Sequence, residues 1–140
     1  MKNLIWNILA LIASFVVTSS IIMAIQMISH YIFPLPANIQ LTDLKDVESL
    51  TKVIPLATML LVVLSYIIGS LAGGYVVGKG ASSDHFAIAG ILGCIMTGAN
   101  IANIMSIPHP LWMIVVTMIT FIPCALIGCY LARNGVLNNR

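Results

Sequence analysis

The side chains best suited to chemistry lie between Thr97 and Trp112, in the stretch T-G-A-N-I-A-N-I-M-S-I-P-H-P-L-W. Asn100 and Asn103 are three residues apart, so a helix places both carboxamides on one face. His109 follows, between two prolines. Such groups can bind a small solute or a lipid headgroup, and two neutral imidazoles can ligate a metal. The spacing matches no known metal motif, so a metal is the weakest of the three.

A second polar pair precedes the first proline-rich corner. Gln26 and His30 are four residues apart, so they share a helix face. We expect these two side chains to reach the level of Asn100, Asn103 and His109 and to form one cluster with them. Two interpretations stay open: the amides join helices by hydrogen bonds, or the cluster lines a polar pocket or pathway.

Other chemical motifs are weak. The three cysteines lie inside apolar runs without a C-x-x-C pair, which is typical of packing rather than of metal or redox work: Cys94, Cys124 and Cys129. Residues 73–80 resemble the start of a phosphate-binding loop, but the Ser or Thr after the lysine is missing. We therefore expect no catalytic residue, no cofactor and no bound metal.

The composition indicates whether water or lipid surrounds the elements that carry these side chains. Of the 140 residues, 60% are hydrophobic and 7% are charged, whereas soluble domains carry about 25% charged residues. Lipid is therefore the expected solvent and the bilayer the expected partner. The net charge of +2 is too small to favour nucleic acid.

Apolar runs of about 20 residues are long enough to span a bilayer. The sequence predicts an all-α protein, a single transmembrane domain built as a four-helix bundle, with spans at about 4–29, 53–78, 86–107 and 111–132. The polar segment after the first span has apolar residues at helical spacing. It predicts a short amphipathic helix at about 43–52 that lies on the membrane surface.

The basic residues predict the orientation. Four of them fall on the side of both termini: Lys2, Lys79, Arg133 and Arg140. Lys45 and Lys52 fall on the other side, together with three acidic residues. Because short flanking segments rich in basic residues stay in the cytoplasm, we expect cytoplasmic termini. The polar cluster and the surface helix then face the extracytoplasmic side.

Small residues four apart predict where helix backbones approach closely. The helix-packing positions are Gly69, Gly73, Gly74, Gly78, Gly93 and Gly98. We expect the span at 86–107 to pack closely against the span at 53–78, because a short turn joins them. The spacing does not distinguish a partner helix in the same chain from one in a second copy or in another membrane protein.

The chain resembles a family of small bacterial four-helix membrane proteins that carries no established activity. The resemblance rests on H-Y-I-F-P-L-P at 30–36, I-P at 54–55, G-S-L-A-G-G at 69–74, the N…P-H-P-x-W signature within 99–112 and F-I-P at 121–123. It implies the four-helix architecture, a bacterial inner membrane and the importance of Asn100, Pro108, His109, Pro110 and Trp112, and also of His30.

Three functions remain open on these observations. The first, which the sequence favours, is a self-associating or accessory protein that packs against itself or a partner through its glycine stripes. The second is a small transporter or channel with a polar vestibule on the extracytoplasmic side. The third, a membrane enzyme that uses His30 or His109 as a base, is the least favoured because no carboxylate or paired nucleophile lies in the spans.

Overall fold

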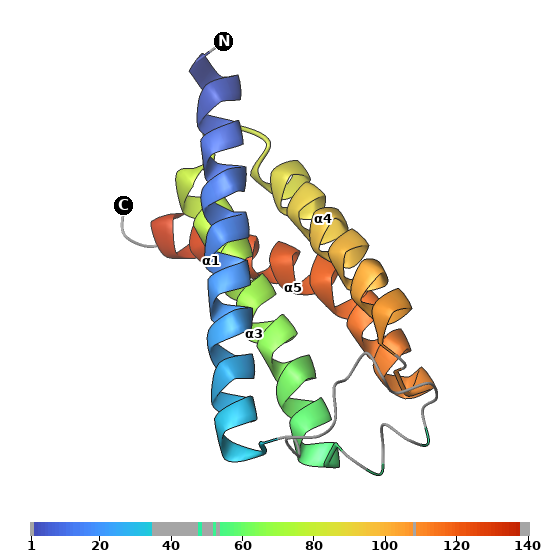
Figure 1. Cartoon of the computed structure of the whole chain (residues 1–140). Coiled ribbons are helices and arrows are strands. Elements are labelled where there is room, and N and C mark those ends of the chain that lie inside the picture. Colours follow the sequence, from blue (N-terminus) through green and yellow to red (C-terminus); the bar gives the residue numbers. More distant parts are fainter. Residues whose placement is uncertain (1, 35–47, 49–51, 53, 108, 138–140) are drawn as a thin grey trace.

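The computed structural model describes residues 2–34, 48, 52, 54–107 and 109–137, with side chains up to residue 135. In this part of the chain there are four helices (Figure 1): α1 (Lys2–Ile32), α3 (Leu56–Gly80), α4 (His85–Ser106) and α5 (Leu111–Leu137). Each is long and apolar enough to cross a membrane. The predictions of an all-α fold and of an integral membrane protein are therefore confirmed.

The helices α1 and α5 extend beyond the ends of the expected spans, and α3 begins later than expected. Pro55 adopts an extended conformation with φ −58° and ψ 145°, and it precedes the helix instead of lying in its first turn. Its carbonyl accepts hydrogen bonds from the N–H groups of Thr58 and Met59. Because proline disfavours the helical conformation in the residue before it, α3 begins at Leu56 rather than at residue 53.

The predicted surface helix at 43–52 lies outside the described residues, apart from Glu48 and Lys52. These two side chains form an exposed ion pair, with Lys52 Nζ 2.6 Å from Glu48 Oε1. The amphipathic helix as a whole therefore stays a prediction.

Helix α3 is the centre of the bundle because its glycines allow close approach on two sides. Gly69 and Gly73 face α1, where an added Cβ on Gly73 would overlap the Thr18 side chain. Gly74 and Gly78 face α5, where a Cβ on Gly74 would overlap the backbone of Ala125. The close approaches of α3 are thus made with two helices of the same chain.

Helix α4 makes its more extensive interface with α5 and contacts α3 less. The expected close packing of the 86–107 span on the 53–78 span is therefore not its main contact. At Gly93 an ideal Cβ would lie 2.7 Å from Ile122 Cα of α5, whereas at Gly98 it would have nothing within 4 Å. The reason is that α1 and α5 already occupy the two glycine faces of α3.

Polar contacts close the bundle at the end that holds both termini. Asn7 Oδ1 accepts hydrogen bonds from the backbone N–H groups of Ser82 at 2.9 Å and Ser83 at 3.2 Å. This ties the start of α1 to the α3–α4 turn. Arg133 Nη1 lies 3.2 Å from His85 Nε2, which brings the end of α5 to the start of α4. The helices therefore alternate in direction.

The core is small, and most large apolar side chains face outward. Its centre is the contact between Tyr66 and Phe121, whose ring centroids are 5.0 Å apart. Leu92 and Val77 pack in the same cluster and are fully buried. The outward-facing apolar side chains need an apolar solvent, as expected of helices in a bilayer.

Candidate functional site

Two adjoining cavities lie at the end of the bundle opposite the termini, where α1 and α4 diverge (Figure 1). The first, here called the α1–α4 groove, has a volume of about 690 Å³ and is lined by residues of 19–31 and 96–103 with Tyr66 and Phe121. The second, here called the end cavity, has a volume of about 600 Å³ and is lined by residues of 26–34, 54–66 and 103–113.

The two cavities share four polar residues: Gln26, His30, Tyr66 and Asn103. These side chains come from three helices, so only the folded bundle brings them together. The cluster expected from the sequence is thus assembled around one space, since Asn100 lines the groove and His109 lines the end cavity. The five residues differ, however, in exposure and in hydrogen bonding.

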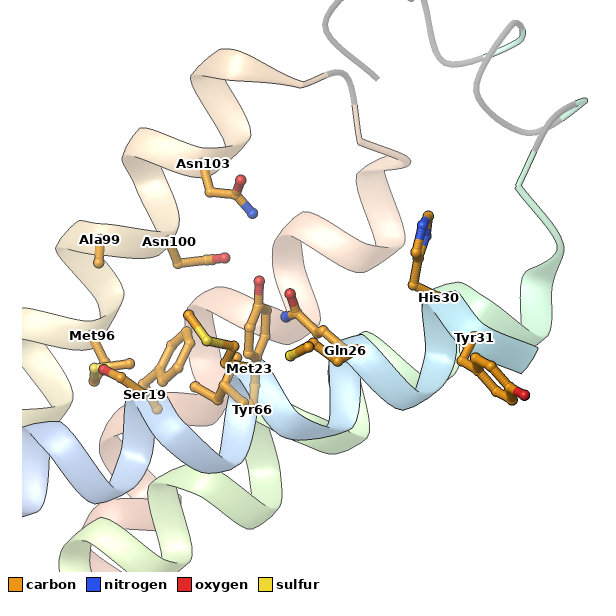
Figure 2. Close-up of a pocket in the computed structure, with 13 residues that line it drawn as sticks. Ser19, Met23, Gln26, His30, Tyr31, Tyr66, Met96, Ala99, Asn100 and Asn103 are labelled. Carbon is orange, nitrogen blue, oxygen red and sulfur yellow. The ribbon is translucent and has the colours of Figure 1, made fainter. Parts of the chain in front are cut away.

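Tyr66 stands at the junction and was not among the residues selected from the sequence. It is buried, with 6% of its surface exposed. Figure 2 shows its hydroxyl directed toward Gln26 and the two asparagines, and the side chains of Gln26 and Asn103 are its hydrogen-bonding neighbours. The signal in the sequence was a tyrosine within an apolar span, because a buried phenol needs a hydrogen-bond partner.

Asn100 joins two helices. It is buried, with 5% exposure, and its Nδ2 donates a hydrogen bond of 3.0 Å to Thr117 Oγ1 of α5. The Thr117 hydroxyl in turn donates to the Ile114 carbonyl at 3.2 Å. The helix-joining interpretation therefore describes Asn100 well.

Asn103 differs from Asn100 although both lie on one side of α4. Its side chain is exposed and turns into the space between α1 and α4 (Figure 2). There it faces the Tyr66 hydroxyl and lines both cavities. Its carboxamide is therefore accessible to a molecule in that space.

The two histidines lie at the rim. His30 is exposed in the last turn of α1, while His109 is half-buried in the α4–α5 corner. His109 Nδ1 lies 2.6 Å from the Ile107 carbonyl. A proton on Nδ1 makes this a hydrogen bond and leaves Nε2 as an acceptor. Within the described residues, no group of three or more His, Cys, Asp or Glu could hold a metal ion.

Two hydroxyl groups in the end cavity were not among the candidate residues selected from the sequence. Ser29 is 2% exposed, and its Oγ is buried without a hydrogen-bond partner among the described residues. Thr58 Oγ1 is likewise buried without a hydrogen-bond partner among the described residues. Both residues line the cavity. No local signal separates Ser29 from Ser14, which donates to the Ala10 carbonyl at 2.6 Å, as helical serines in membranes commonly do.

No Asp, Glu, Lys or Arg of the described chain lines either cavity. Two of the three acidic residues that the sequence places on this side, Asp43 and Asp46, lie outside the described residues. The site consists of amide, hydroxyl and imidazole groups among apolar side chains. It can therefore exchange hydrogen bonds with an occupant, and the described lining residues offer it no permanent charge.

Comparison of the chain with known protein families, with curated proteins and with solved structures finds no match.

Proposed function

We propose that the chain is a small membrane transport protein whose two cavities form one binding vestibule. The observation that carries the proposal is the meeting of Gln26, Tyr66 and Asn103, from three helices, at the junction of the two cavities. Polar side chains inside a membrane are costly and mark pathways or binding sites. Bonding between helices accounts for Asn100, which donates to Thr117. A vestibule also gives a role to the polar groups that line the cavities, such as Asn103 and His30.

The basic residues support an orientation with both termini in the cytoplasm, because Lys2, Lys79 and Arg133 lie at the closed end of the bundle. The vestibule then opens on the extracytoplasmic side. The resemblance to small bacterial membrane proteins supports a location in the bacterial inner membrane. Cysteine accessibility tests this orientation. A cysteine at position 30 should react with an impermeant reagent on intact cells, and one at position 79 should react only after lysis.

The transport proposal is tested by flux into proteoliposomes over a panel of ions, small solutes and lipids. Tyr66→Phe removes the central hydroxyl and keeps the ring, so flux should fall severalfold. Tyr75→Phe is the matched control, because Tyr75 lies on α3 away from both cavities and contacts Lys79 through its ring. Equal flux in the two variants, or no flux under any condition, would contradict a transport vestibule.

Self-association is the second candidate, and one observation favours it. Four small residues recur along α4 at intervals of four: Gly90, Cys94, Gly98 and Ala102. An added Cβ at Gly90 or Gly98 would meet nothing within 4 Å. This face of α4 is therefore free for close approach by a second copy or a partner helix.

The self-association candidate is tested by thiol cross-linking in nanodiscs. In a background with Cys124→Ala and Cys129→Ala, Cys94 should give covalent dimers, and Gly98→Leu should abolish them. Gly135→Leu serves as the control, because Gly135 also has open space around it but lies outside this stripe. A protein that stays monomeric by native mass spectrometry would exclude this candidate.

An enzymatic role remains the least favoured function, because no carboxylate of the described chain lines the vestibule. If His30→Ala and His109→Ala leave flux and cell phenotype unchanged, neither histidine serves as a base.

A further inference from the structure

We infer that the vestibule takes an amphipathic lipid with an uncharged headgroup, which enters sideways from the bilayer through the α1–α4 groove. This inference rests on the proposed function, since it names the class of molecule that the same vestibule binds. Four features of the groove and the end cavity support it: the apolar wall, the polar junction, the unpartnered hydroxyls and the absence of charge.

The groove has an apolar wall that faces outward between two membrane-spanning helices. Met23 and Met27 of α1 are 65% and 67% exposed, and Met96 and Ala99 line the opposite side from α4. Methionine side chains are unbranched and adapt to flexible apolar partners. In a bilayer these side chains meet acyl chains, so the wall suits a lipid tail.

The polar junction lies at the inner end of this wall. Gln26 and Asn103 each carry a donor and an acceptor, and the Tyr66 hydroxyl lies between them (Figure 2). A headgroup drawn in from the groove would meet these three groups first. The mixture of donors and acceptors suits hydroxyl and ester groups.

The end cavity continues beyond the junction and holds hydroxyl groups that have no hydrogen-bond partner among the described residues. Ser29 Oγ is buried and unpartnered within the described chain, and so is Thr58 Oγ1. A buried polar group without a partner destabilises the protein. A headgroup that reaches the end cavity would supply the missing hydrogen bonds.

The lack of charge among the described lining residues decides the type of headgroup. No Lys or Arg of the described residues lines either cavity to neutralise a phosphate, and no Asp or Glu lines them to hold an amine. A charged headgroup would lose its hydration without gaining a counter-charge. The end cavity, at about 600 Å³, lies in the range of pockets that hold small organic molecules. Diacylglycerol is a lipid with these properties.

The test is photo-labelling in phosphatidylcholine nanodiscs with a diazirine-bearing diacylglycerol, followed by mass spectrometry of the labelled peptides. Label should concentrate on residues 19–31 and 96–103. Excess unlabelled diacylglycerol should displace it, whereas phosphatidylglycerol should not. Glycerol carries the hydroxyl groups without the chains, and it too should fail to displace the label.

Three variants test whether photo-labelling depends on the side chains of the groove and the end cavity. Tyr66→Phe should lower labelling about fivefold, the effect of one lost hydrogen bond, and Ser29→Ala should lower it less. Ala99→Phe should block the groove and abolish labelling. Tyr75→Phe should leave it unchanged.

Several outcomes would overturn the inference. Uniform labelling of all four helices would mean lipid contact without a site. Displacement by phosphatidylglycerol would contradict an uncharged site, and displacement by glycerol would show a soluble ligand. Solute flux that depends on Tyr66, together with uniform labelling, would leave the transport proposal intact and remove only the lipid. Loss of both signals would remove both proposals.

Discussion

The two ends of the bundle use similar polar residues in opposite ways. At the end that holds the termini, here called the closed end, the Asn7 side chain is hydrogen-bonded to the α3–α4 turn. Its oxygen accepts from two backbone N–H groups, and its nitrogen donates to the Ser83 hydroxyl. At the open end, Asn103 turns its amide into the space beside Tyr66. The same side chain therefore fixes the structure in one place and stays accessible in the other.

The distance between helix backbones also differs between the two ends of the bundle. Near the closed end α3 and α5 approach so closely that Gly74 and Gly78 lie against the backbone of α5. Toward the open end α1 and α4 diverge (Figure 1), and cavities take the place of backbone contact. The difference indicates that the closed half supplies stability and leaves the open half available for binding. Four substitutions test this division.

The largest effect is expected at Gly74. Gly74→Ala should lower the free energy of unfolding by about 3 kcal/mol, because the new Cβ would overlap the Ala125 backbone, which cannot move aside easily. Gly98→Ala, with open space around it, is the control and should be neutral. The measurement is reversible unfolding in detergent micelles. Equal stability of both variants would show that α3 and α5 are not closely packed.

The next effect is expected at Asn7. Asn7→Ala removes three hydrogen bonds from the α3–α4 turn, and it should cost about 2 kcal/mol. Asn103→Ala should change stability little, since its side chain is exposed and Gln26 remains beside the Tyr66 hydroxyl, but it should reduce binding in the vestibule. The same unfolding measurement and the lipid-labelling assay separate the two. A reversed order would contradict the division into a structural and an accessible end.

A smaller effect is expected at Asn100. Asn100→Ala breaks the hydrogen bond to Thr117 and should cost about 1 kcal/mol, the usual scale of such bonds between membrane helices. A double-mutant cycle with Thr117→Val isolates the pair. A coupling energy near zero would show that Asn100 does not join α4 to α5.

The smallest effect is expected at Ser29. Its hydroxyl has no partner in the described chain, so Ser29→Ala should leave the empty protein equally stable or stabilise it by up to about 1 kcal/mol. Ser14→Ala is the matched control. It removes a hydroxyl that bonds the Ala10 carbonyl, so it should be slightly destabilising. A marked loss of stability in Ser29→Ala would mean that the hydroxyl is already satisfied.

The candidate site could be predicted from the sequence only in part. The i, i+3 spacing predicted that Asn100 and Asn103 would lie on one side of a helix, and helical spacing did the same for Gln26 and His30. It could not predict that Asn100 would be buried against Thr117 while Asn103 would stay exposed, because the position of α5 decides this. Tyr66 was overlooked because its apolar span has no amide or imidazole at helical spacing beside it.

The sequence by itself determined the environment and the elements of this protein. Long apolar runs have no stable alternative to helices in lipid, since every backbone group must be bonded within its own segment. Tertiary structure alone decided which faces meet. The glycines of α3 could have packed against any helix, in this chain or in another, and in the folded bundle they pack against α1 and α5. The cavities at the open end follow from that choice, because α4 lies on α5 and diverges from α1.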